Sequence, residues 1–285
     1  MFNLKLPQIT LTRVNWWQLL TNKSLQAKRI NIDNASFNVF LDRTLPSASN
    51  KNKNNFPHQL LMHIHMPVYI SDLRLNRASI AYTEYSPLSK RNGTVYFDGV
   101  NATVTNITNI PEQIRRNNKT TINASTLFMH KVPSTVSFHF DLSQLKTGDY
   151  SADVKMSALD STIVNPIAEP MGLFTVKRGS MQKAIARIHG NNYNASGKVL
   201  ILYKDLHLTP LKPDQADSGK LTKKHFTSFI ANSVFVKDEN PSKGEAPRNP
   251  VAYRERKGGD LFNLTWKTML IGLLKTIGIP EKYAD

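Results

Sequence analysis

The feature of this sequence that most constrains its fold is an alternation of apolar and polar side chains with a period of two, which continues from the N-terminus to about residue 208. Successive side chains of an extended chain point to opposite faces, so each strand has one apolar and one polar face. Continuous apolar strands, typical of parallel sheets covered on both faces, are missing. The pattern predicts an antiparallel sheet with one hidden face and one face in water. The clearest expected strands are residues 30–32, 35–41, 73–75, 78–82, 95–97, 100–104, 136–140, 150–156, 184–188 and 199–203.

An internal repeat supports this interpretation, because residues 30–39 align without gaps on residues 73–82. In both copies the alternation slips by one residue and then resumes. Such a slip reverses the exposed face unless the chain bends or forms a bulge, so we expect a bend at Asn34 and at Arg77. Chance similarity between two amphipathic strands is the alternative, and the matching Ala-Ser pairs after each slip favour a true repeat.

Polar segments interrupt the strands at residues 47–55 and 111–118, and a third break at residues 210–224 ends the strand region. These segments are expected to be loops. The sequence therefore divides into a groove region of amphipathic sheet, residues 1–208, and a terminal region, residues 209–285. For the terminal region the pattern predicts a short helix at 223–232, a strand at 234–236, a loop at 241–250, a strand at 251–254 and a long helix at 260–277.

The composition offers no catalytic chemistry. The chain has no cysteine, which excludes disulfides, thiol nucleophiles and cysteine-ligated metals. It also lacks a Gly-rich phosphate loop, a nucleophile elbow and a zinc-binding His-Glu-x-x-His helix. His63 and His65 would share one face of an extended segment, but no third ligand with metal spacing lies nearby, so two solvent-facing histidines are the simpler interpretation. We therefore expect a protein that is not an enzyme, with no catalytic residue, no cofactor and no metal site.

The balance of charge is strongly basic, with 37 Lys and Arg against 21 Asp and Glu, a net +16. The basic residues are scattered through strands and loops and no nucleic-acid-binding motif is present, so we do not expect nucleic acid as a partner. Anionic lipid headgroups account for the same charge. No apolar stretch reaches the ~18 residues of a membrane-spanning helix, and the N-terminus lacks the pattern of a signal peptide. Either the protein is cytosolic or the chain lacks its beginning.

The long helix expected near the C-terminus has clear ends, with Asp260 as its N-cap, Gly278 in the left-handed cap position and Pro280 beyond it. Two interpretations of its wide apolar face stay open. Trp266 with flanking lysines is typical of a helix that lies on a membrane or a partner, whereas most such helices cover the core of their own domain. Gly272 near its centre would permit close packing of the second kind. The apolar face comprises Phe262, Trp266, Met269, Leu270, Leu273, Leu274 and Ile277.

Several segments together resemble the AsmA-like proteins of Gram-negative envelopes. They are DRTLP at 42–46, FPHQLL at 56–61, YTEY at 82–85, GTVYFD at 93–98, VTNITN at 104–109, YKDL at 203–206, NP at 240–241, Arg248 and FNLTWK at 262–267. The resemblance covers roughly residues 25–110 and 185–280. It implies a curved, elongated antiparallel sheet of the repeating-β-groove type, akin to chorein-like bridge proteins, whose apolar inner face shelters lipid tails. Family members usually carry an N-terminal membrane anchor and a long preceding β-region, so we expect a C-terminal portion of a longer protein or a shortened relative.

Together these observations predict a mainly β protein with a lipid-sheltering groove and two amphipathic helices in its terminal region, one short and one long. Its expected role is in phospholipid transport or outer-membrane biogenesis, in the periplasm or cell envelope. Expected partners are phospholipid or another acyl lipid and a membrane surface or envelope protein. The alternative is a structural or partner-binding β-domain without lipid cargo. The candidate groove residues, chosen by alternation, are Ile30, Ile32, Phe37, Val39, Leu73, Leu75, Ile80, Tyr82, Phe97, Val100, Val104, Phe138, Phe140, Val199 and Ile201.

Overall fold

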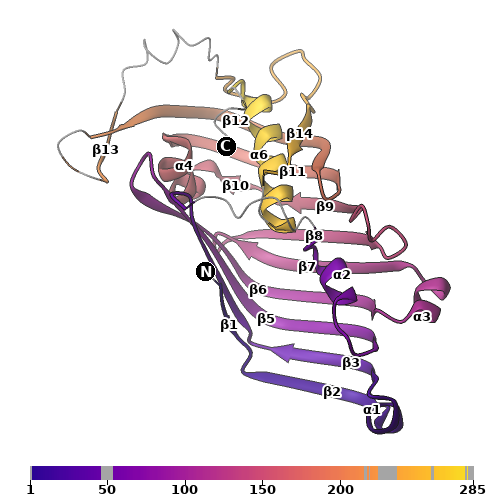
Figure 1. Cartoon of the computed structure of the whole chain (residues 1–285). Helices are drawn as coiled ribbons and strands as arrows, with labels where there is room; N and C mark the ends of the chain where they lie inside the picture. The colour runs from indigo at the N-terminus through magenta and orange to yellow at the C-terminus, as the bar shows by residue number, and fades with distance from the viewer. Residues whose placement is uncertain are drawn as a thin grey trace.

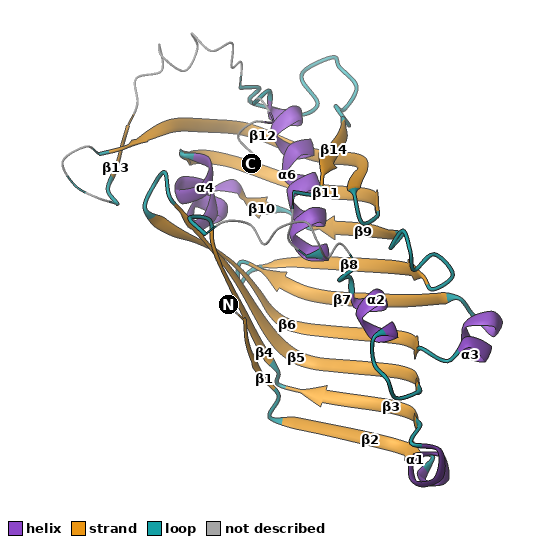
Figure 2. Cartoon of the chain, in the orientation of Figure 1, coloured by secondary structure: helices purple, strands orange, loops and turns teal. Residues whose placement is uncertain are grey.

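The protein is mainly β, and the computed structural model shows one large, open and curved sheet of 14 strands (Figures 1 and 2). The structure describes residues 2–45, 54–214, 217, 219–223, 236–257, 260–279 and 281. The strands are β1 (Phe2–Lys5), β2 (Gln8–Val14), β3 (Leu25–Asp33), β4 (Ser36–Asp42), β5 (Val68–Ser86), β6 (Arg91–Thr108), β7 (Lys119–Phe128), β8 (Val132–Asp141), β9 (Tyr150–Met156), β10 (Leu159–Asp160), β11 (Phe174–Gly190), β12 (Asn194–Pro213), β13 (Leu221–Lys223) and β14 (Val251–Glu255). The helices are α1 (Trp16–Asn22), α2 (Pro57–Met62), α3 (Pro111–Arg116), η1 (Ser161–Val164), α4 (Asn165–Gly172) and α6 (Leu261–Ile277). The expected mainly β, curved sheet with a C-terminal amphipathic helix is confirmed.

The sheet is mixed, because the two copies of the repeat lie beside each other in parallel. β3 and β4 pair with the long strand β5 at a constant offset, with Ile30 opposite Leu73 and Phe37 opposite Ile80. All other strand pairs are antiparallel, as the alternation predicts. A parallel pair needs a crossover connection, and the segment between β4 and β5, which includes α2, supplies it.

Both predicted bends are present at the repeat. Asn34 and Arg77 have positive φ values of 56° and 52°, and the Arg77 guanidinium donates to Asn34 Oδ1 at 3.2 Å. The residues just before the two copies, at the same offset, form an ion pair, with 2.5 Å between Arg29 Nε and Asp72 Oδ1. Residues 43 positions apart are therefore similar in sequence and also contact each other through side-chain hydrogen bonds and an ion pair.

The register places apolar side chains in continuous rows across the sheet. One row crosses from β2 to β14, and the next row lies two residues further along each strand. The first row is Leu11, Ile30, Leu73, Val104, Ile122, Phe138, Ala152, Ile188, Gly197 and Ala252, and the second is Ile9, Ile32, Leu75, Ala102, Ala124, Val136, Val154, Ala186 and Val199. Beyond the bends a third row continues with Leu4, Phe37, Ile80, Phe97, Phe128 and Val132.

The opposite face is polar at the positions between these rows. Its residues include Thr10, Asn31, Arg74, Thr103, Asn123, Ser137, Asp153, Arg187 and Lys198. We call the apolar face the inner face and the polar face the outer face. A sheet with this division keeps one side in water and needs a cover for the other.

Helix α6 covers the C-terminal end of the inner face (Figure 1). Asp260 caps its N-terminus by accepting a hydrogen bond from the Asn263 backbone N–H at 2.8 Å, and Gly278 ends it with φ 83°, as the sequence predicts. Leu264, Leu274 and Ile277 are buried in the core shared with β9, β11, β12 and β14. The helix therefore belongs to the core of its own chain, as in the second of the two interpretations. The division of the chain at residue 208 stays a prediction.

Some sequence-based expectations are wrong in detail. Residues 111–118 contain the short helix α3 rather than only a loop, and the expected break at 210–224 begins too early, because β12 runs to Pro213 and β13 follows. The strands β1, β2, β7, β10 and β13 are not among the clearest expected strands. The expected strand at 251–254 is β14, and 241–250 is largely without regular structure, as expected. The expected short helix at 223–232 and strand at 234–236 lie almost entirely outside the described residues.

The close approach of Gly272 to β12 gives a test of this packing. A Cβ added to Gly272 would lie 2.4 Å from Val199 Cγ2, so Gly272→Ala overpacks the contact despite the better helix propensity of alanine, worth about 1 kcal/mol. We expect Gly272→Ala to lower the free energy of unfolding by about 1–3 kcal/mol in urea titrations. Adding Val199→Ala should recover part of this loss. A stabilised single variant would contradict the described packing of α6.

Candidate functional site

The structure places the candidate groove residues on the inner face. Ten belong to the three rows described above, and Val39 with Tyr82 forms a fourth short row that ends at Phe2. Val100 packs with Ile32, Leu75, Ile80 and Phe97, and Phe140 lies beside Phe138. Ile201 lines a cavity beneath α6. All fifteen candidates therefore lie on the apolar face that the alternation defines.

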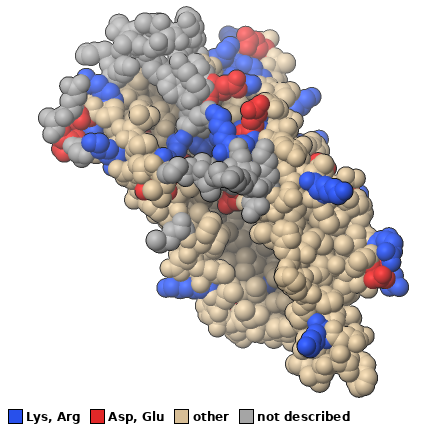
Figure 3. All heavy atoms as spheres, viewed as in Figure 1, with Lys and Arg blue, Asp and Glu red and all other residues tan. Residues whose placement is uncertain are grey.

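The inner face has two differently covered halves. In the C-terminal half α6 and α2 lie over the strands, and Phe140, Val199 and Ile201 are buried. In the N-terminal half most candidate side chains are only partly buried, and Phe2, Leu4, Ile9 and Leu11 at the ends of the rows are exposed. Figure 3 shows a hollow on this face, walled mostly by uncharged side chains.

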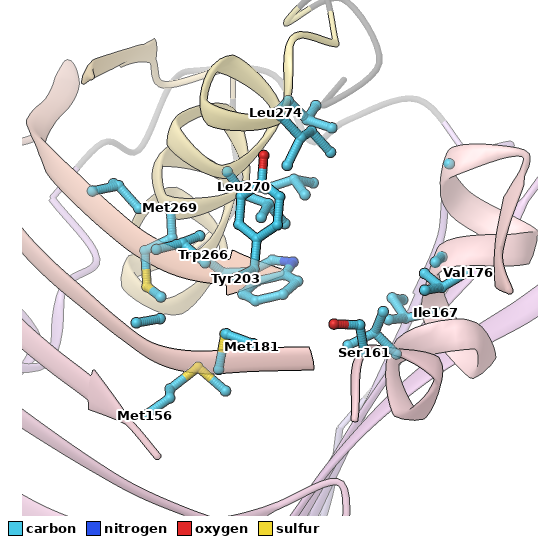
Figure 4. Close-up of a pocket in the computed structure, with 18 of the residues that line it drawn as sticks. Met156, Ser161, Ile167, Val176, Met181, Tyr203, Trp266, Met269, Leu270 and Leu274 are labelled. Atoms are coloured by element: carbon cyan, nitrogen blue, oxygen red, sulfur yellow. The ribbon is translucent and has the colours of Figure 1, made fainter. Parts of the chain in front are cut away.

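An apolar cavity of about 190 Å³ lies between α6, the strands β9–β12 and the segment formed by η1 and α4 (Figure 4). Six of the seven residues expected on the apolar face of α6 line it, namely Trp266, Met269, Leu270, Leu273, Leu274 and Ile277. The seventh, Phe262, packs against Tyr82 and Phe97, with ring centroids 5.1 and 5.9 Å apart. Six of these side chains thus line a partly open apolar pocket formed by the chain itself. A cavity of ~150 Å³ lined by aliphatic and aromatic side chains stays dry and binds small apolar molecules, so this one is suited to part of an acyl chain.

A charged cluster lies at one wall of this cavity. Glu84 on β5 and Lys267 on α6 have side chains only 3% and 7% exposed, with 3.8 Å between Lys267 Nζ and Glu84 Oε2. Arg43 Nε lies 3.9 Å from the same oxygen, and the Tyr82 hydroxyl donates to Glu84 Oε1 at 2.8 Å. Burial, followed by the nearby Glu84 carboxylate, raises the pKa of Tyr82. The cluster joins α6 to β5 across the inner face and is the main polar feature of an otherwise apolar wall.

Helix α2 crosses the inner face and is held there by side chains from distant parts of the chain. Phe56, just before it, is fully buried, packs edge-on against Tyr150 and lies under the guanidinium of Arg256, whose Cζ is 4.5 Å from the ring centroid. Gln59 Nε2 donates to the backbone carbonyl of Leu145 at 2.7 Å. These contacts fix the crossover segment on β8 and β9.

His58 within α2 is buried without a polar partner. Its side chain is 3% exposed, neither ring nitrogen has a hydrogen-bond partner among the described residues, and its ring lies 4.8 Å from that of Phe140. Burial lowers the pKa of His58 from 6.5 to about 4. The folded protein therefore holds this histidine in its neutral form.

The sequence interpretation missed the crossover helix and the buried charges. Pro57 at the first helical position, followed by Gln59 whose side chain accepts from the Phe56 N–H at 3.2 Å, is a recognisable helix-start signal. Lys267 is one of the lysines that flank Trp266 in the sequence, and no local pattern indicates that it meets Glu84. His63 and His65 are exposed, and the described residues form no group of three or more potential metal ligands.

Comparisons with protein-family models, curated proteins and solved structures find no match for this chain. The resemblance to AsmA-like proteins accordingly stays a prediction from the sequence. Within the described parts of the chain, no helix has the length and apolar character needed to cross a membrane.

The buried His58 predicts a loss of stability in mild acid. The unfolded chain binds a proton at this residue near pH 6.5 and the folded chain only near pH 4, so the contribution of neutral His58 is complete above pH 6.5 and is lost as the pH falls toward 4. The shift corresponds to about 3 kcal/mol at most. We expect His58→Phe to reduce the pH dependence of the free energy of unfolding between pH 6.5 and 4, as measured by denaturant titration at several pH values. The exposed His65→Phe serves as a control, and an equal pH dependence in wild type and His58→Phe would contradict the burial of this ring.

Proposed function

We propose that this protein is a non-enzymatic carrier whose apolar inner face shelters acyl chains of phospholipid or a similar lipid. The observation that carries the proposal is the set of uninterrupted apolar rows that run from β2 to β12, which the helices of the described residues cover at one end only. An exposed apolar surface of this extent is unfavourable in water and is typical of an interaction site.

The geometry suits a chain-like ligand. The rows form a strip along which an extended acyl chain contacts apolar side chains on successive strands, and the cavity under α6 lies at its C-terminal end. Each methylene removed from water contributes about 0.8 kcal/mol, so a long tail gains affinity from many weak contacts without any specific polar group. The outer face, being polar, stays in water.

The wider role that we propose is phospholipid transport or outer-membrane biogenesis in the periplasm or cell envelope, as the resemblance to AsmA-like proteins implies. A second candidate is a partner-binding β-domain without lipid cargo. The buried contacts of α6 and α2 favour it, because they show that part of the inner face is closed by the chain itself. The two proposals differ in whether the N-terminal half of the inner face accepts lipid.

A pair of charge substitutions separates them. Val39→Asp with Ile80→Asp puts two carboxylates on the inner face, where they oppose binding of apolar chains. Asn38→Asp with Ser79→Asp places the same two charges one residue away, at exposed positions of the outer face. We expect the inner pair to weaken binding of a fluorescent fatty acid at least tenfold, and the outer pair to leave it near the wild-type value.

Circular dichroism and thermal melting of each variant show whether the fold is kept. If the aspartates unfold the protein, Val39→Ser with Ile80→Ser gives a milder test with the same expected direction. Lipid extracted from protein purified with membranes and identified by mass spectrometry should decrease in parallel. Equal binding by the inner and outer pairs in folded protein would contradict the lipid proposal and favour a partner-binding domain.

A further inference from the structure

Helix α1 forms the connection between the antiparallel strands β2 and β3, and its apolar side chains are exposed. Trp16, Trp17 and Leu20 are 65%, 73% and 78% exposed, and no residue of α1 is buried. At about 100° per residue these three side chains fall within one arc of roughly 100° on the helix. Single exposed apolar residues are common, but two adjacent tryptophans and a leucine on one arc form a patch that calls for a cover.

The helix does not need these side chains to complete its own fold. Asn15 caps the N-terminus by accepting from the Gln18 N–H at 3.1 Å, and the Thr21 hydroxyl donates to the Trp17 carbonyl at 2.7 Å. Lys23 ends the helix in the left-handed conformation with φ 48°, and the Asn15 N–H donates to the Gln26 carbonyl at 2.8 Å. Hydrogen bonds thus order α1 and its two ends, while the apolar side chains of the patch stay exposed to water.

The charge around α1 has one sign. Residues 2–32 contain five basic side chains and no Asp or Glu, and Arg13 and Lys23 lie on either side of the helix. Arg29 pairs with Asp72 further along the sheet, whereas Arg13, Lys23 and Lys28 are exposed. Exposed tryptophan beside basic residues matches the chemistry of an anionic membrane surface, where indoles settle at the headgroup level and cations meet lipid phosphates.

We propose that α1 is the membrane-contacting surface of this protein and inserts Trp16, Trp17 and Leu20 into the headgroup region of an anionic bilayer. Figure 1 places α1 at the end of the sheet away from α6, beside the half of the inner face that the described residues leave uncovered. Contact there brings lipid to the open end of the rows. The inference rests on the proposed function, since it names the surface at which the groove meets a membrane, and it gives this role to α1 in place of the buried α6.

The test uses the full chain and vesicles of phosphatidylcholine with about one third phosphatidylglycerol. Wild-type protein should float with these vesicles, and raised salt should weaken binding because it screens the basic residues. Trp16→Ser with Trp17→Ser should reduce the bound fraction at least tenfold. Leu45→Ser with Leu88→Ser removes two comparably exposed leucines elsewhere and should leave flotation unchanged.

Fluorescence locates the contact directly, because Trp16, Trp17 and Trp266 are the three tryptophans of the chain. In a Trp266→Phe background, brominated phospholipids should quench the remaining emission if α1 enters the bilayer. The inference is overturned if wild type does not float, if the tryptophan pair floats like wild type, or if the leucine pair loses flotation equally. A large fall in melting temperature on replacing the tryptophans would also overturn it, since it would place them in the fold.

Fatty-acid binding in the absence of vesicles, measured on the same variants, separates this inference from the proposed function. If the tryptophan pair loses flotation and keeps fatty-acid binding, both stand. If fatty-acid binding is present and flotation is independent of α1, the inference fails alone. If no variant or wild type binds fatty acid, the groove proposal fails, whatever the flotation shows.

Discussion

The structure depends on covering one face of a single sheet whose inward side chains are almost all apolar. Cross-strand pairs such as Leu73 with Val104 and Ile122 with Phe138 extend this face strand by strand without interruption. A two-layer fold would close it with a second sheet or several helices. Among the described residues, α6 covers one end of this face and α2 packs against β8 and β9, and they leave the remaining apolar surface without a cover.

At the C-terminal end of the sheet, α6 covers the inner face with close packing and a buried ion pair. Helix α6 lies so close to Val199 of β12 that position 272 admits no side chain, and the Glu84–Lys267 pair links the helix to β5. A buried ion pair adds little net stability, but separating its two partners is costly, because each charge was removed from water to form it. The result is an ordered cap with an apolar cavity beneath it, next to an open strip of the same composition.

Period-two alternation and caps are local properties, so the sequence predicts the mainly β fold, the inner-face residues and the ends of α6 well. The slip of alternation at Asn34 and Arg77 also predicts the bends, since both residues adopt positive φ. Other features depend on contacts between residues far apart in the chain, such as Arg256 with Phe56. They are the parallel pairing of β3 and β4 with β5, the position of α2 on the inner face and the burial of Lys267. No local periodicity encodes these contacts, and the exposure of Trp16 and Trp17 became visible only once the strands around them were placed.

The central claim is that acyl chains lie on the inner face and not on the outer face. Because the chain has no cysteine, single cysteines can be introduced at Leu75 on the inner face and at its neighbour Arg74 on the outer face, each carrying an environment-sensitive fluorophore. Titration with a long-chain fatty acid should shift the emission of the label at position 75 to the blue, saturably, and leave that at position 74 unchanged. Equal shifts at both positions, or none at position 75, would contradict the account.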